Sequence, residues 1–211
     1  TESLSKFCDG SASLTALAED DRVYGPVEQL LGPNVIWGGS GAARYVGDSF
    51  WHKDDYAGVR DSYPYVKAVI YFEPVERDTG CLRVIPGSHH LASPDPIALL
   101  RHRNEALDFM PFGVRPSEIP CYAFESQPGD VLVFTESLAH ASFGGSPGRQ
   151  QHAINFMENP KTDEQVAYIK SLYKSWKYGL RPAESYVNSD RPRIRRMVSR
   201  LVELGFETSK A

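Results

Sequence analysis

Two histidines and one aspartate in this chain have the types and the spacing of an iron site. His52 and Asp54 are two residues apart, and His140 follows much later in the chain. On an extended strand, residues two apart leave the same face, so His52 and Asp54 can bind one metal ion while Trp51 and Lys53 point the other way. Two imidazoles and one carboxylate on one face of an iron ion leave three positions open for a cosubstrate and oxygen. The pattern therefore predicts a non-haem iron centre.

Short strands are expected to position these ligands. The middle of the chain is rich in β-branched and aromatic segments bounded by Pro, Gly, Asp or Asn. The expected strands are 35–37, 43–46, 65–72, 81–85, 122–125, 131–134 and 153–156. A glycine-rich segment between the first two predicts a turn. Regular short strands favour a sandwich or a barrel, in which a neighbouring strand can bring His140 to the other two ligands.

Helices are expected on both sides of the strand region. Residues 26–31 predict a short helix that stops at a Gly-Pro pair. Thr162 and Gln165 have the spacing of a capping box, and an apolar stripe with helical spacing ends at Gly205. The stripe consists of Ile194, Met197, Val198, Leu201 and Val202. We expect the helices over 161–206 to brace the sheet.

The segment 91–120 interrupts the strand pattern. It contains five prolines and a predicted helix over 97–103. Long connections in compact domains usually carry function, so we expect this segment to cover a site and not to build the core.

A lone His-x-Asp triplet has roughly a one-in-three chance of arising by accident in a chain of this composition, so the flanking segments must support it. Trp51-His52-Lys53-Asp54, the segment GCLRVIPGSH at 80–89, GDVLVF at 129–134 and His140-Ala141-Ser142 occur in this order. Together they resemble motifs of the phytanoyl-CoA dioxygenase family of iron(II)- and 2-oxoglutarate-dependent oxygenases. The resemblance extends over about residues 35–156.

The resemblance implies a mainly β fold, the double-stranded β-helix (jelly roll, cupin-like), with flanking α-helices. It implies that His52, Asp54 and His140 hold Fe(II), with 2-oxoglutarate and O2 as cosubstrates. Ser142, two residues after the distal histidine, matches the serine that touches 2-oxoglutarate in the family. Halogenating relatives lack the carboxylate ligand, so the presence of Asp54 favours hydroxylation, with desaturation or ring closure as further outcomes.

More than one residue is a candidate anchor for the far carboxylate of 2-oxoglutarate. The family places an arginine at the position of Gln151, whereas this chain has Arg149 two residues earlier. Arg149 and Gln151 face the same side of an extended strand, so we expect Arg149 to serve as the anchor. Lys67 is the second candidate, because a charge within an apolar strand needs an anionic partner.

The expected substrate is a small molecule whose identity the sequence leaves open. Tyr56 follows the ligand strand and is expected to line the mouth of the pocket. Arg44 and His89 are candidates for contacts with an anionic substrate. No segment of 91–120 forms a recognisable nucleotide-binding loop, so a coenzyme A partner is unsupported.

The length and composition of the chain bear on its number of domains and its partners. The length of 211 residues and the 41% hydrophobic content favour a single domain over residues 1–211, with a core over about 35–156. A net charge of -4 gives no basic field for nucleic acid, and arginines crowded near the C-terminus are expected on a solvated helix face. The oligomeric state is left open.

The cysteines and the apolar segments bear on the compartment. Cys8, Cys81 and Cys121 lack the spacing of a zinc site or a disulfide framework and are expected to be reduced thiols. The apolar stretch 66–72 is interrupted by Lys67 and is too short to cross a membrane. The acidic N-terminal residues have no secretory signal pattern. We therefore expect a cytoplasmic protein with no membrane partner.

Two other function classes are compatible with the same residues. One is a metal-binding jelly roll without redox chemistry, such as an isomerase or a sensing domain. The other is a degenerate family member that serves as an interaction module, since the arginine is displaced by two residues.

Overall fold

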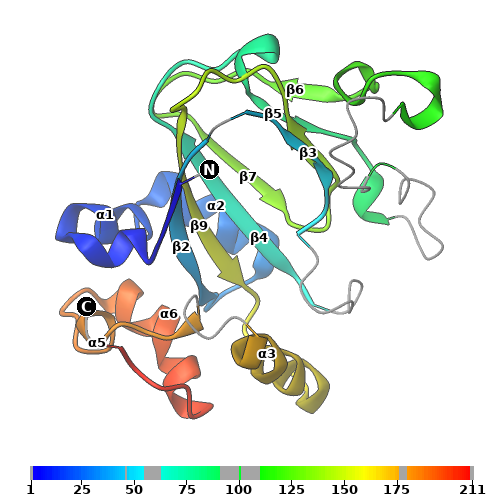
Figure 1. Cartoon of the computed structure of the whole chain (residues 1–211). Helices are drawn as coiled ribbons and strands as arrows, with labels where there is room; N and C mark the ends of the chain where they lie inside the picture. The colour runs from blue at the N-terminus through cyan, green and yellow to red at the C-terminus, as the bar shows by residue number, and fades with distance from the viewer. Residues whose placement is uncertain are drawn as a thin grey trace.

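Two antiparallel sheets face each other in the computed structural model of the chain (Figure 1). The model describes residues 2–45, 47–54, 63–90, 100, 110–175 and 180–209. Among these residues the larger sheet has the strand order β1-β2-β9-β4-β7, and the smaller sheet has the order β3-β8-β5-β6. The strands are β1 (Glu2–Ser5), β2 (Ile36–Arg44), β3 (Ser49–His52), β4 (Tyr65–Tyr71), β5 (Leu82–Val84), β6 (Tyr122–Phe124), β7 (Val131–Thr135), β8 (His140–Ser142) and β9 (Gln150–Met157). This arrangement is the predicted double-stranded β-helix.

Strand alternation sends the side chains of β4 to two different environments. Val66 and Ala68 are buried in an apolar cluster with the helices, on the outer face of the larger sheet. Val69 and Tyr71 belong to a second cluster, which lies between the two sheets. Lys67 has the same parity as Val69 and therefore points into the barrel, where it lines a cavity.

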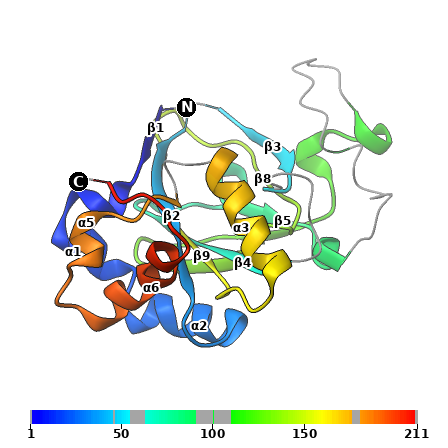
Figure 2. The ribbon, with the colours of Figure 1, turned by 90° about the horizontal axis from the view of Figure 1, so that it is seen from below.

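The helices cover the outer face of the larger sheet (Figure 2). They are α1 (Ala12–Leu17), α2 (Asp21–Leu31), α3 (Asp163–Ser175), α5 (Glu184–Val187) and α6 (Pro192–Glu203). Single 3-10 turns are η1 (Phe7–Gly10), η2 (Arg77–Thr79), η3 (Ser88–His90), η5 (Pro111–Gly113) and η6 (Pro116–Glu118). Helix α6 packs against β2 and α5, which confirms that C-terminal helices brace the sheet. The assignment of the whole chain to one domain stays a prediction.

The structure corrects the predicted beginning of the first long helix. The prediction began this helix at Pro26, but α2 begins at Asp21 and includes Pro26 within it. The Asp20 carboxylate accepts a hydrogen bond from the backbone N–H of Arg22 and caps the helix. The cap satisfies an N-terminal donor, which explains the earlier start. The predicted end is confirmed, because α2 stops before Gly32.

The predicted turn between strands 35–37 and 43–46 is wrong. These residues form one strand, β2, which pairs with β9 through a register shift between Trp37 and Ser40. Gly39 has φ +98° at this irregularity. A Cβ atom on Gly38 would lie 2.8 Å from the backbone of Asn155. The glycines therefore permit close approach of β9 and a local bulge, and they do not end the strand.

Other local predictions were closer to the structure. Thr162 Oγ1 accepts a hydrogen bond from Gln165 N–H, and Gln165 Oε1 accepts one from Thr162 N–H, which confirms the capping box. The stripe on α6 is buried except for Val202, which is 40% exposed. The predicted helix 97–103, apart from Leu100, and most of the covering segment lie outside the described residues. Within the described residues, no helix combines the length and the apolar character needed to span a membrane.

Candidate metal centre and anion anchor

His52, Asp54 and His140 converge inside the barrel. His52 ends β3 and His140 begins β8, and the two residues are paired across these adjacent antiparallel strands. Asp54 follows β3, and its backbone N–H donates to the carbonyl of Glu136 at 3.0 Å. One ligand atom from each of the three side chains lies within 4.8 Å of the other two. The structure thus brings together the three residues that the sequence predicts as metal ligands.

Backbone contacts orient both imidazoles toward Asp54. The Nδ1 atom of His52 lies 2.7 Å from the carbonyl oxygen of Phe50, and the Nδ1 atom of His140 lies 2.8 Å from that of Leu138. Each carbonyl accepts the Nδ1–H hydrogen, which leaves Nε2 with a free lone pair. The two Nε2 atoms lie 3.5 and 3.4 Å from the carboxylate oxygens of Asp54. Two neutral nitrogens and one carboxylate are a donor set that fits ferrous iron.

The electrostatics of the triad favour the forms that bind a metal. Burial lowers the pKa of His52, and the nearby His140 lowers it further, so the imidazole stays neutral. Burial alone would raise the pKa of Asp54, but Lys67 and the two histidines outweigh it and hold this pKa well below its usual range. A neutral His52 imidazole and an ionised Asp54 carboxylate are the ligating states, so neither group has to lose a proton before a cation binds.

A buried ion-pair network adjoins the triad. Lys67 Nζ forms an ion pair with Asp54 Oδ2 and lies 3.2 Å from Glu136 Oε1. Glu136 is 2% exposed. Burial raises the pKa of Glu136 to about 8, against the opposing effect of Lys67. The anionic partner that the sequence requires for Lys67 is therefore present in the protein as Asp54, and the carboxyl group of Glu136 is a second neighbour.

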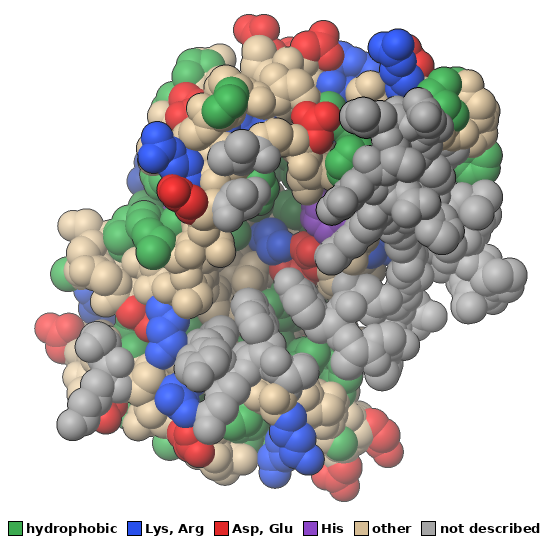
Figure 3. All heavy atoms as spheres, viewed as in Figure 1, with side chains coloured by type: hydrophobic (Ala, Val, Ile, Leu, Met, Phe, Trp, Pro, Cys, Tyr) green, Lys and Arg blue, Asp and Glu red, His purple; other side chains and the backbone are tan. Residues whose placement is uncertain are grey.

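A cavity of about 130 Å³ connects the triad to a buried cation. The hollow is visible in Figure 3, where histidine, acidic and basic side chains lie together in it. The wall contains each predicted ligand and anchor residue, and it consists of Tyr45, Ser49, His52, Asp54, Lys67, Val69, Tyr71, Leu82, Phe134, His140, Ala141, Ser142, Arg149 and Gln151. Arg149 and Gln151 thus face one cavity, as expected from their period-two spacing.

The guanidinium of Arg149 is held in place from several sides. Arg149 is 3% exposed and lies with its Cζ atom 4.8 Å from the ring centroid of Tyr45. Its Nη1 donates to the carbonyl of Gly80 at 2.6 Å, and Ser142 Oγ donates to the same oxygen at 2.8 Å. The Nε atom of Arg149 is buried without a hydrogen-bond partner among the described residues. An unsatisfied guanidinium donor beside a cavity fits a carboxylate ligand.

Two glycines make room for this guanidinium. A Cβ atom on Gly80 would lie 1.5 Å from Arg149 Nη1, and one on Gly145 would lie 2.3 Å from it. Gly80 also has φ +98°, which disfavours other residues. Sequence reasoning assigned Gly80 to a motif but missed this role and those of Tyr45 and Glu136. The role of Gly80 depends on a contact with a residue 69 positions away.

The candidate substrate residues are less well placed. Arg44 is exposed at the end of β2 and does not line the cavity of the triad. His89 lies in η3, is partly buried, and is also absent from this cavity wall. Tyr56 lies outside the described residues. Their assignment to substrate binding stays a prediction.

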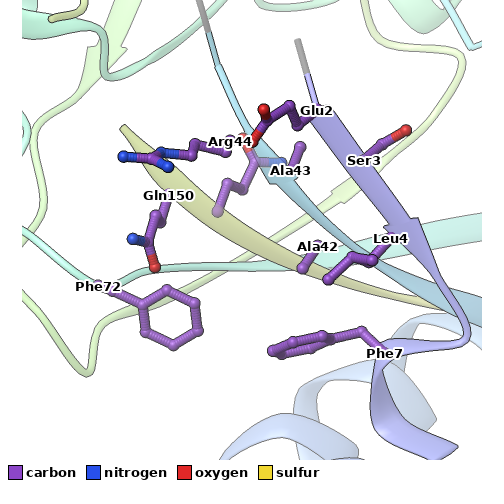
Figure 4. Close-up of a pocket in the computed structure, with 10 residues that line it drawn as sticks. Glu2, Ser3, Leu4, Phe7, Ala42, Ala43, Arg44, Phe72 and Gln150 are labelled. Carbon is purple, nitrogen blue, oxygen red and sulfur yellow. The ribbon is translucent and has the colours of Figure 1, made fainter. Parts of the chain in front are cut away.

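A second pocket, of about 450 Å³, lies beside β1 and the outer face of β2 (Figure 4). Phe7 and Phe72 flank it, and Arg44 and Gln150 lie at one end. It is larger than the cavity of the triad, but the described residues of its wall include no histidine and one acidic residue, Glu2. A site with so few groups for metal ligation or proton transfer is a weaker candidate than the smaller cavity.

Comparisons with known proteins give the family and the fold. A sequence model of the family described as Phytanoyl-CoA dioxygenase (PhyH) matches residues 3–150. No protein of curated function matches the chain. The structures below are under 25% identical to the chain, so their likeness supports the fold.

HygX from Streptomyces hygroscopicus with iron bound is 20% identical, with a TM-score of 0.60 over 77% of this chain and 74% of HygX. HygX with nickel and 2-oxoglutarate bound is 19% identical, with a TM-score of 0.61 over 77% and 72%. SnoN, a non-heme alpha ketoglutarate dependent epimerase from nogalamycin biosynthesis, is 20% identical, with a TM-score of 0.54 over 74% and 62%.

Proposed function

The chain belongs to the phytanoyl-CoA dioxygenase family, and we propose that it is an iron(II)- and 2-oxoglutarate-dependent oxygenase that hydroxylates an unactivated carbon of a small molecule. The observation that carries this proposal is one cavity whose wall contains both the three ligating side chains and the buried Arg149. This pairing of a metal site with an anion site suits a keto acid, which has a chelating end and a distal carboxylate.

The cofactors are iron(II) and 2-oxoglutarate, with O2 as the second cosubstrate. His52, Asp54 and His140 would hold the iron, since their ligating atoms already face one another. When bound, iron with 2-oxoglutarate and O2 supplies the oxidising power for cleavage of a C–H bond, which no side chain of the protein can supply.

The protein's own residues bind and orient the keto acid. Arg149 offers its unsatisfied Nε donor to the distal carboxylate, and Ser142 lies beside it on the same carbonyl of Gly80. Because the carbonyl oxygen of Gly80 holds both Arg149 and Ser142, the two side chains have fixed orientations toward an incoming carboxylate. Gln151 lines the same wall and is a further contact for the keto acid.

Apolar side chains complete the cavity. Val69, Leu82 and Phe134 lie on its wall, and each is buried. Such a wall limits the access of water to the reacting groups and strengthens the electrostatic contacts of Arg149 and Asp54. Exclusion of water favours oxidation of the substrate over unproductive consumption of 2-oxoglutarate.

An anaerobic titration tests the proposal at the binding step. Iron(II) and 2-oxoglutarate added together should give a weak visible charge-transfer band near roughly 500 nm, which iron with open positions allows. Absence of the band, with intact binding of a divalent cation, would favour a metal-binding jelly roll without redox chemistry. Failure to bind any cation would favour a non-catalytic family member.

Analysis of products tests the reaction itself. Candidate small molecules should be screened for O2-dependent stimulation of succinate formation from 2-oxoglutarate, followed by mass spectrometry of the product. Hydroxylation adds one oxygen atom to the substrate, desaturation and ring closure remove two hydrogens, and epimerisation leaves the mass unchanged. The product mass therefore separates hydroxylation from the other outcomes of the same site.

A further inference from the structure

We propose that Lys67 is a resident counter-ion that occupies Asp54 in the metal-free protein and transfers to Glu136 when Asp54 binds the metal. The inference rests on the proposed function, because it concerns the metal site of the same cavity. It assigns to Lys67 a positioning role in metal binding and to the buried Glu136 the role of second acceptor for the lysine ammonium.

The geometry of Asp54 places Lys67 in competition with a metal ion. Lys67 Nζ pairs with Asp54 Oδ2, and the Nε2 atom of His140 lies 3.4 Å from the same oxygen. The other oxygen of Asp54 is 3.5 Å from Nε2 of His52. A cation held between both histidines and Asp54 would lie close to the ammonium group. Repulsion between the two cations is strong in a site this buried, so the ammonium must shift.

Glu136 lies where the displaced ammonium can be received. Its Oε1 is 3.2 Å from Lys67 Nζ, and its side chain is 3% exposed. Neither carboxyl oxygen has a hydrogen bond of normal geometry among the described residues. A buried carboxyl group without hydrogen bonds is costly, so its retention beside Lys67 is best explained by a second arrangement in which it accepts from that lysine.

Backbone contacts keep the donor and both acceptors together. The carbonyl of Glu136 accepts the N–H of Asp54 at 3.0 Å, and the N–H of Glu136 donates to Tyr65 near the start of the strand that carries Lys67. A small rotation of the lysine side chain is then enough to change partners. A carboxylate and a carboxylic acid both offer an acceptor oxygen, so the exchange needs no proton transfer.

Two other roles for Lys67 predict different changes in ligand binding when the lysine is removed. If Lys67 merely orients Asp54 for the metal, its removal should weaken metal binding. If Lys67 anchors the distal carboxylate of 2-oxoglutarate, its removal should leave metal binding unchanged and weaken binding of the keto acid. The counter-ion role alone predicts tighter metal binding after removal, since a competing cation is lost.

The test is calorimetric titration of the metal-free protein with Mn(II), a divalent probe that does not oxidise during the measurement. Lys67→Met should bind Mn(II) about tenfold more tightly than the wild type, because a positive charge beside the site is lost. Its metal-free form should melt at a lower temperature, and saturating Mn(II) should raise the melting temperature by more than in the wild type. Lys67→Gln is the second variant, should Lys67→Met fail to fold.

Variants of the receiver complete the experiment. Glu136→Leu removes the acceptor and should weaken Mn(II) binding about tenfold, whereas Glu136→Gln keeps an acceptor oxygen and should weaken it less. Lys161→Met is the matched control, since Lys161 pairs with Glu158 at the surface and should leave the affinity unchanged. Equal losses in the two Glu136 variants would overturn the receiver role.

The outcomes separate this inference from the proposed function. Unchanged or weaker Mn(II) binding in both Lys67 variants, with normal binding by the wild type, overturns the counter-ion role and leaves the oxygenase proposal intact. A wild-type protein that binds neither Mn(II) nor iron(II) overturns both.

Discussion

The two faces of the larger sheet have different roles, although the same strands form both: one packs against the helices and the other lines the cavity. On the outer face, Ile154 and Phe156 of β9 are fully buried against the helices. On the inner face, Gln151 of the same strand lines the cavity, as do Lys67 and Tyr71 of β4. Strand alternation alone separates the two sets. Stability and ligand binding should therefore respond independently to substitutions that lie one residue apart in the sequence.

The largest expected effect is on the outer face. Phe156→Ala should lower the free energy of unfolding by about 3–5 kcal/mol, because the ring is fully buried and contacts Trp37 edge to face. Denaturant unfolding measures the loss, and Mn(II) titration of the folded variant should give the wild-type affinity. A folded Phe156→Ala protein with strongly weakened metal binding would contradict the separation of the two faces.

The next effect should appear in binding alone. His140→Ala removes one of three metal ligands and should weaken Mn(II) binding by more than about 100-fold. The free energy of unfolding of the metal-free protein should change by less than about 2 kcal/mol, because the lost contacts line a cavity. His90→Ala is the control, since His90 is exposed and lies outside the triad. Retained Mn(II) binding in His140→Ala would show that the metal site lies elsewhere.

A third prediction separates the residues of the cavity that bind the metal from those that bind the carboxylate of 2-oxoglutarate. Gly80→Ala should weaken 2-oxoglutarate binding roughly 10- to 100-fold and leave Mn(II) binding unchanged, because the new Cβ would displace the Arg149 guanidinium. Titration of the Mn(II)-loaded protein with 2-oxoglutarate measures the effect.

Gly129→Ala provides the matched control for backbone strain. Gly129 has φ +99°, close to the +98° of Gly80, but a Cβ atom there would meet nothing within 4 Å. The two variants thus share the unfavourable backbone conformation and differ in the collision with Arg149. Similar losses of 2-oxoglutarate affinity in both would mean that strain, and not displacement of the guanidinium, causes the effect.

Features that depend on nearby residues could be predicted from the sequence. The period-two spacing of His52 and Asp54 and the stripe of α6 follow from local geometry, and the capping box was read from two residue types three apart. Val202 was misassigned because an apolar residue at the edge of a helical stripe can remain exposed. The short strands similarly indicated a sandwich or barrel before the family resemblance specified which one.

Features that depend on contacts between distant segments could not be predicted from local patterns alone. Glycines in β2 have the local pattern of a turn, and only the close approach of Asn155 explains their place in a strand. Glu136 gave no signal, since an acidic residue after an apolar strand is usually solvated, and its burial beside Lys67 exists only in the folded barrel. The packing of the Arg149 guanidinium likewise depends on Gly80 and Tyr45, which belong to other segments.

A titratable residue tests whether the outer face controls stability alone. His152 is fully buried on the outer face of β9, next to the inward-facing Gln151, and its Nε2 lies 3.3 Å from Cys8 Sγ. Burial lowers the pKa of His152 to about 4. An unfolded histidine binds a proton near pH 6.5, so between about pH 6.5 and 4 the unfolded state binds more protons than the folded state. The contribution of His152 to the free energy of unfolding must therefore fall as the pH is lowered through this window.

His152→Leu removes this titration. The free energy of unfolding at pH 4.5, relative to that at pH 7.5, should therefore be about 2 kcal/mol higher in the variant than in the wild type. The comparison is made within each protein, between the two pH values, so a constant packing change in the variant cancels. Denaturant unfolding at each pH measures the slope, and 2-oxoglutarate titration at pH 7.5 should give the wild-type affinity because residue 152 faces away from the cavity. An unchanged pH dependence would show that His152 is not the group that destabilises the fold in acid, and a loss of 2-oxoglutarate affinity would show that the outer face of β9 also shapes the binding site.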